Sequence, residues 1–147
     1  MTPSLPDILI GQCAALAMPL PPEAEGDYAA GRLGLLVMLA ALAAQEAERG
    51  VAARIWENQT LRALFAKAGQ AYDGELDGRL GPAAAGVDHD LSWSALDRAN
   101  ADLRRLLIAL HEAAEGRRDG ALDRDILALY GRMAHERRLA FPAVMGG

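Results

Sequence analysis

Apolar residues along the chain recur at helical rather than strand spacing. The first such segment predicts a helix over about residues 5–18, which is ended by the prolines that follow it. The next helix is expected to begin at Asp27, whose carboxylate can accept hydrogen bonds from the first turn. It is expected to end near Gly50, because glycine favours the left-handed conformation that closes many helices.

The middle of this second segment is apolar on every face. Residues 33–44 form a run of 12 without a charged side chain, which is short of the ~20 needed to cross a bilayer. An ordinary surface helix carries only an apolar stripe, so neighbours are needed on all sides of this one. The pattern therefore predicts a buried central helix over about residues 27–49.

Three further segments follow, separated by polar stretches. Residues 52–71 continue as a third helix, and residues 73–90 are predicted to be a long acidic, Gly-rich loop, with a short helix around 75–80 as the alternative. A fourth helix is expected to begin after Ser92 or Ser94, and a fifth near Asp123. The tail, residues 143–147, is expected to be frayed.

Composition favours an all-α fold. The chain of 147 residues has 31 Ala, whereas Val, Ile and Thr together number only 11, so good helix formers are abundant and sheet formers scarce. The length suits one domain with one core. We therefore expect a single all-α domain, 1–147, arranged as a five-helix bundle.

Charge and cysteine content limit the partners and the compartment. The formal net charge of −5 gives no overall attraction to nucleic acid or to anionic membranes, and neither is expected as a partner. The single cysteine, Cys13, cannot form an intramolecular disulfide, which favours the cytoplasm. Because no base or cation neighbours it in the sequence, we expect a buried, inert thiol.

Motifs that bring catalytic groups together are absent from the sequence. No Gly-x-Ser-x-Gly turn, phosphate-binding Gly-rich loop or Glu-x-x-His pair occurs. His111 and Glu115 are spaced i,i+4 and could share one side of a helix, but a metal site needs three or four converging ligands. We therefore expect no catalytic residues, no metal and no cofactor.

One polar patch interrupts an apolar stripe. Continuing the stripe of the helix over 52–71 backwards reaches Arg54, Glu57 and Asn58. Buried ions must be paired, so this patch is either a structural ion network, for instance with Arg32 or Glu46, or it lines a cleft. In the second interpretation the candidate polar cleft comprises Arg54, Glu57, Asn58, His111 and Glu115.

Several segments resemble a known family. Residues 44–50, Glu57 and residues 61–64, with weaker similarity over 96–98 and 127–140, resemble a family of small uncharacterised all-helical proteobacterial proteins. Members are often encoded beside acyl-CoA dehydrogenases and aminoglycoside-phosphotransferase-like kinases. The resemblance covers residues 28–142 and implies an accessory role in acyl-CoA or amphiphile metabolism. It implies no catalytic residues.

These observations favour a cytoplasmic accessory or protein-interaction module without intrinsic catalysis. Its partner is expected to be another protein or a second copy, in a homodimer formed through a leucine-rich helix face. The alternative is a small-molecule- or metal-binding helical bundle, or an enzyme, that uses the polar cleft. A third interpretation is a chaperone-like binder of an amphipathic helix from another protein.

Overall fold

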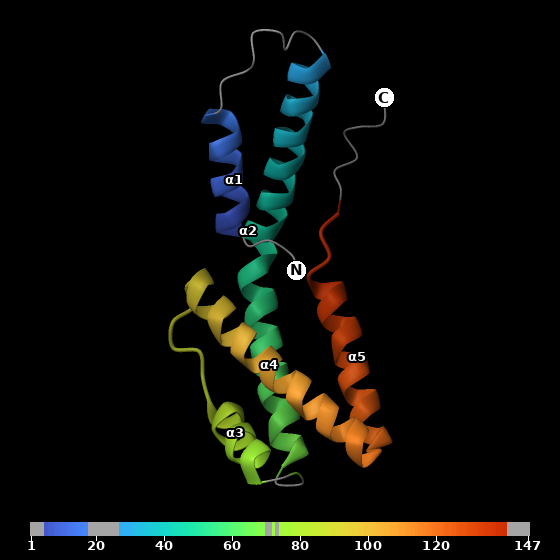
Figure 1. Cartoon of the computed structure of the whole chain (residues 1–147). Helices are drawn as coiled ribbons and strands as arrows, with labels where there is room; N and C mark the ends of the chain where they lie inside the picture. The colour runs from blue at the N-terminus through green and yellow to red at the C-terminus, as the bar shows by residue number, and fades with distance from the viewer. Residues whose placement is uncertain (1–4, 18–26, 70–71, 73, 141–147) are drawn as a thin grey trace. The chain divides into compact units, whose positions relative to one another are not determined.

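The computed structural model describes residues 5–17, 27–69, 72 and 74–140. These residues form five α-helices and no strand, which confirms the all-α prediction (Figure 1). Among them, no helix combines the length and the apolar character needed to cross a membrane. The helices are α1 (Leu5–Ala17), α2 (Asp27–Ala68), α3 (Gly74–Ala85), α4 (Trp93–Arg117) and α5 (Gly120–Glu136).

The chain divides into two compact units. The N-terminal unit comprises residues 1–49 and 139–147, and the C-terminal unit comprises residues 50–138. α2 contributes its first part to the N-terminal unit and its remainder to the C-terminal unit. The expectation of a single domain stays a prediction, because this division describes how closely segments pack and not whether each folds alone.

The predicted break at Gly50 is wrong. α2 continues from Asp27 to Ala68, and the left-handed glycine that follows its end is Gly69, with φ of 61°. The Gly69 N–H donates to the Phe65 carbonyl at 3.2 Å and so closes the last turn. A glycine inside a helix costs only about 1 kcal/mol relative to alanine. The helix formers on both sides of Gly50 offset that cost.

The prediction that residues 27–49 form an enclosed central helix is also wrong. Within the N-terminal unit, Leu33, Leu35 and Val37 are 63, 51 and 52 % exposed. Within the described part of this unit, the helix beside α2 is α1, where the Gln12 side chain donates to the Leu36 carbonyl at 3.1 Å (Figure 1), and Ala140 exchanges two hydrogen bonds of 2.8 Å with the Gln45 side chain. One neighbouring helix covers one side, so apolar side chains on other sides face solvent. Cys13 on α1 is exposed as well, contrary to expectation.

Most of the predicted loop over residues 73–90 is helical. α3 forms because Leu76 and Leu80, spaced i,i+4, are buried in the core, and the Asp77 carboxylate accepts from the Tyr72 N–H at 3.2 Å. Pro82 lies in the last turns, where the helix is already close to its end. The alternative of a short helix inside this stretch is the correct one, although the helix is longer than expected.

The core of the C-terminal unit joins all four of its helical segments. α4 supplies its leucine stripe, as predicted, and packs against both α3 and α5. Fully buried members include Leu61, Leu107 and Ile126. At up to about 3 kcal/mol for each fully buried large apolar side chain, this cluster is the main stabilising element of the unit.

Side-chain caps set where the last two helices begin. Ser92 caps α4, because its hydroxyl accepts from the Ala95 N–H at 3.4 Å. Of the two starts that the sequence predicted, Ser92 and Ser94, the first is correct. Asp119 caps α5, accepting from the Leu122 N–H at 3.1 Å, so the helix begins at Gly120 rather than near Asp123. The tail for which fraying was predicted, 143–147, lies outside the described residues.

Candidate functional site

The polar patch of α2 is buried in the C-terminal unit. Arg54, Glu57 and Asn58 are spaced so that they share a face with Leu61 and Phe65, and that face meets α4. Glu57 and Asn58 are 0 % exposed and Arg54 is 2 % exposed. Burial of a charge is costly unless the charge is paired and hydrogen-bonded, so the partners decide what this patch can do.

Glu57 is paired with Arg137, which follows α5 directly. The guanidinium binds the carboxylate in a bidentate manner, with Nε–Oε1 and Nη2–Oε2 distances of 2.6 Å. Asn100 of α4 donates to Glu57 Oε2 at 2.8 Å and accepts from Arg137 Nη2 at 2.8 Å. The carboxylate therefore receives three charge-assisted or amide hydrogen bonds.

Asn58 extends the pairing toward the segment that precedes α4. Its side-chain oxygen accepts from Asn100 at 3.0 Å, and its amide donates to Asp88 at 3.2 Å. Asp88 also receives a bidentate pair from Arg62, at 2.7 and 2.9 Å. The hydrogen bonds from Arg62 lower the pKa of Asp88 below its ordinary value of 3.8, against the opposing effect of burial. We call Glu57, Asn58, Arg62, Asp88, Asn100 and Arg137 the Glu57 network.

Arg54 lies beside this network and has its own partners. Its Nε donates to Asp97 at 2.8 Å and its Nη1 to the Gly50 carbonyl at 3.2 Å. The guanidinium carbon lies 4.0 Å from the centre of the Trp93 ring, which adds a cation–π contact. Arg54 is thus held by a carboxylate, a carbonyl and an aromatic ring, as a buried guanidinium requires.

A second group lies where α4 turns into α5. His111 Nε2 is 2.9 Å from Asp123 Oδ1 and 3.9 Å from Glu115 Oε1. One ligand atom from each of the three residues lies within 4.8 Å of the others. The His111 ring also packs against Tyr130, with 5.8 Å between ring centres. We call His111, Glu115 and Asp123 the His111 cluster.

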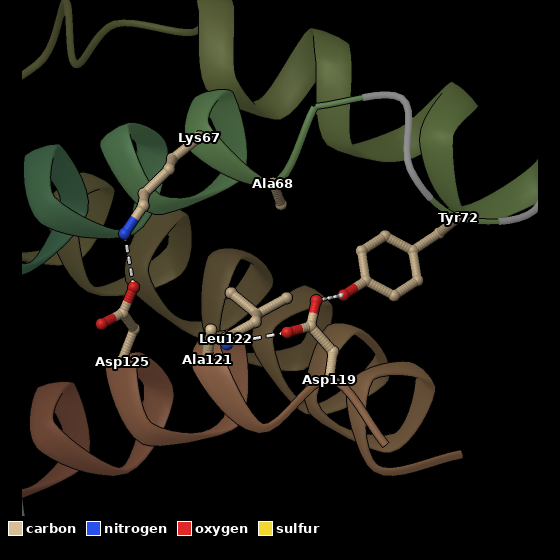
Figure 2. A pocket seen from close by; sticks show the side chains of 7 residues that line it. All are labelled: Lys67, Ala68, Tyr72, Asp119, Ala121, Leu122 and Asp125. Carbon is tan, nitrogen blue, oxygen red and sulfur yellow. Dashed lines mark hydrogen bonds and ion pairs between the residues drawn. The ribbon is translucent and has the colours of Figure 1, made fainter. Parts of the chain in front are cut away.

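A cavity of about 180 Å³ lies between the end of α2 and the start of α5 (Figure 2). In Figure 2 the Tyr72 hydroxyl donates to Asp119 at 3.3 Å, and Lys67 is ion-paired with Asp125. Burial, followed by the neighbouring Asp119 carboxylate, raises the pKa of Tyr72 above 10.0. The polar groups drawn in this cavity bond to one another, so it offers a ligand little unpaired chemistry.

The five residues of the predicted polar cleft fall into two separate places. Arg54, Glu57 and Asn58 form a buried ion network, the first of the two interpretations, whereas His111 and Glu115 belong to the His111 cluster. Asn100 and His111 are 11 residues apart on α4, about 16 Å along the helix axis at 1.5 Å per residue. A ligand-binding role for either group stays a prediction.

Sequence reasoning missed the partners of these residues. Asn100 carried a usable signal, because it occupies a position between Leu96 and Leu103 in the apolar stripe of α4. A polar residue at such a position needs a buried partner. Arg137 and Asp123 carried no such signal, since each lies among exposed charged residues in the sequence and only the tertiary fold brings it to its partner.

Comparison with known proteins adds no relative from which a site could be transferred. No protein-family model, curated protein or solved structure matches the chain.

Proposed function

We propose that this protein is a helical interaction module that self-associates through the apolar first part of α2 and performs no catalysis of its own. The observation that carries the proposal is the exposure of Leu33, Leu35 and Val37, at 63, 51 and 52 %. All three lie in the uncharged run of residues 33–44, which we call the apolar run. Exposed large apolar side chains grouped in one helical segment are typical of interaction sites.

The exposed side chains of the apolar run face more than one direction. At about 100° per residue, Leu33 and Val37 share a face of α2, whereas Leu35 points roughly to the opposite side. Covering a half-exposed leucine or valine gains about 1 kcal/mol. A partner helix packed along the face of Leu33 and Val37 therefore covers two of the three residues, whereas Leu35 lies on the other side of α2.

The lack of charged side chains in the apolar run permits a second copy as that partner. Two chains that each carry −5 repel one another, and they approach at least cost through surfaces without charge. The apolar run provides such a surface over about three helical turns. In a two-fold dimer the same patch meets itself, so one uncharged apolar helix is sufficient for both sides of the interface.

The absence of catalysis is supported by how the polar side chains are used. In the C-terminal unit, the buried side chains of Arg54, Glu57 and Asn58 bond to Asp88, Asp97, Asn100 and Arg137. Catalytic groups need a free reactive atom facing a substrate-sized space. Side chains committed to ion pairs of this kind stabilise a fold rather than bind substrate.

The setting of this role follows from composition and resemblance. A lone cysteine and the negative net charge favour a cytoplasmic protein whose partners are proteins rather than nucleic acid. The resemblance to a proteobacterial family encoded beside acyl-CoA dehydrogenases supports an accessory role near acyl-CoA or amphiphile metabolism.

Light scattering coupled to size-exclusion chromatography tests self-association. The wild-type chain is expected at the mass of two chains at micromolar concentration, and Leu33→Glu at the mass of one. Leu127→Glu is the matched control, because Leu127 of α5 is 53 % exposed in the C-terminal unit. It should leave the dimer intact.

Two results contradict the proposal. A wild-type chain that stays monomeric at high micromolar concentration removes self-association. A Leu33→Glu variant that dimerises as well as the wild type places the interface elsewhere. Helix content of both variants is measured by circular dichroism, so that loss of dimer is separated from loss of fold.

A further inference from the structure

The strongest unassigned chemistry in the described residues is the His111 cluster. It joins an imidazole of α4, a carboxylate one turn later and a carboxylate in the first turn of α5. Its three donor atoms, His111 Nε2 and one oxygen each from Glu115 and Asp123, lie within 4.8 Å of one another. We propose that this cluster binds a divalent transition-metal ion, with Zn²⁺ as the ion that suits the ligands best.

The spacing of the donor atoms fits a shared ion. Two atoms bound to one zinc at about 2.0–2.2 Å lie roughly 2.9–3.5 Å apart at bond angles of 90–109°. His111 Nε2 and Asp123 Oδ1, at 2.9 Å, already have this separation. The 3.9 Å between His111 Nε2 and Glu115 Oε1 shortens by rotation of the Glu115 side chain, which is 66 % exposed and free to turn.

The backbone holds two of the ligands in fixed positions. α4 and α5 are connected by Arg118, in the left-handed conformation with φ of 55°, whose N–H donates to the Glu115 carbonyl at 3.0 Å. Asp119 then caps α5 and receives a hydrogen bond from Leu122. The His111 ring packs against Tyr130 and its side chain is only 19 % exposed. An ion bound here finds two of its three ligands preorganised and connects α4 with the start of α5.

Ligand chemistry selects the class of ion. Imidazole nitrogen suits zinc and its transition-metal neighbours, whereas Mg²⁺ and Ca²⁺ prefer oxygen ligands alone. Two carboxylates and a neutral imidazole carry a charge of −2, which balances a divalent cation. Three protein ligands leave a fourth position for water, the pattern of open zinc sites. If His111 and Asp123 share only a hydrogen bond, Glu115 has no role in the cluster. Substitution of Glu115 therefore distinguishes a metal site from a simple hydrogen bond.

Calorimetric titration of the metal-free full chain with Zn²⁺ tests the site. One ion is expected per chain. His111→Gln, Glu115→Gln and Asp123→Asn are each expected to weaken Zn²⁺ binding. Loss of a residue that only hydrogen-bonds a metal ligand weakens metal binding roughly 10–100-fold, so loss of a ligand itself should weaken it by at least that factor. His135→Gln and Glu112→Gln are the matched controls, because both residues are exposed on the same two helices outside the cluster. They should leave the affinity unchanged.

The proposal is overturned if the wild type binds no Zn²⁺ at micromolar concentration, if Glu115→Gln binds as tightly as the wild type, or if a control variant abolishes binding. Glu115 is exposed, so its variant is expected to fold, and its circular dichroism confirms this. A second measurement uses Co²⁺, which in a four- or five-coordinate protein site gives intense visible d–d bands that the hydrated ion lacks. Those bands should appear in the wild type and in Leu33→Glu, which separates this site from self-association, and should be absent from His111→Gln.

Discussion

Replacing Glu57 by Gln is the perturbation that tests the buried ion network most sharply. The carboxylate is 0 % exposed and receives two bonds of 2.6 Å from Arg137 and one of 2.8 Å from Asn100. Removing one partner of a buried ion pair costs about 3–5 kcal/mol, because the remaining charge is left uncompensated. The Arg137 side chain is 19 % exposed and reaches some solvent, so we expect a loss of about 3 kcal/mol.

Urea unfolding followed by tryptophan fluorescence measures this loss. Trp56 and Trp93 are the two tryptophans of the chain, and both lie in the C-terminal unit that contains the network. The fluorescence change therefore reports unfolding of that unit. Glu112→Gln, an exposed substitution of the same chemistry on α4, is the control and should change stability by less than about 0.5 kcal/mol.

A double-mutant cycle separates pairing from other effects of the substitution. Glu57→Gln, Arg137→Gln and the double variant should give a coupling energy of about 2 kcal/mol, within the range for residues in one network. The double variant should be less destabilised than the sum of the single variants. A coupling energy below about 0.5 kcal/mol would refute the reasoning, because the two residues would then be energetically independent.

Three further outcomes follow from the C-terminal unit. Asp88 has a lowered pKa, so its contribution to stability is present above pH 3.8 and is lost as the pH falls below that value. The stability of Asp88→Asn, measured by urea unfolding, should therefore depend less on acid pH than that of the wild type. An equal dependence excludes this role for Asp88. Leu107→Ala at a fully buried position should lower the free energy of unfolding by about 2–5 kcal/mol in the same assay, with exposed Ile108→Ala as control. Spectroscopic titration at 295 nm of a Tyr28→Phe variant, in which Tyr72 and Tyr130 are the two remaining tyrosines, should find both ionising above pH 10.0, and a transition below that pH contradicts their burial.

The fold was predictable where local patterns and tertiary packing agree. The leucine stripe of α4 was predicted from spacing alone, and the start of the helix was narrowed to Ser92 or Ser94, because both depend on residues close together in the sequence. Gly50 misled the prediction, since glycine permits a helix end without requiring one. α3 was obscured by its glycines and Pro82, although Leu76 and Leu80 had the spacing of a buried helical face.

The candidate site was predictable only in part. Arg54, Glu57 and Asn58 stood out as polar residues on an apolar face, and their burial in an ion network was one of the two interpretations of that pattern. Their principal partners did not, because Arg137 is 80 residues from Glu57 and Asp88 is 30 residues from Asn58. Such pairings depend on how helices cross, which periodicity does not determine. Exposure of the apolar run was missed for the same reason. An apolar helix indicates that its side chains favour contact with other apolar surfaces, but it does not indicate whether another helix of the chain or a partner provides them.

Hydrogen–deuterium exchange at two protein concentrations tests the central claim most directly, namely that the apolar run is covered by a second copy. As the concentration rises from nanomolar to high micromolar, amides of residues 33–44 should become more protected, whereas those of α4 and α5 should exchange at unchanged rates. Unchanged exchange in residues 33–44, or protection that rises instead in α4 and α5, would contradict the account.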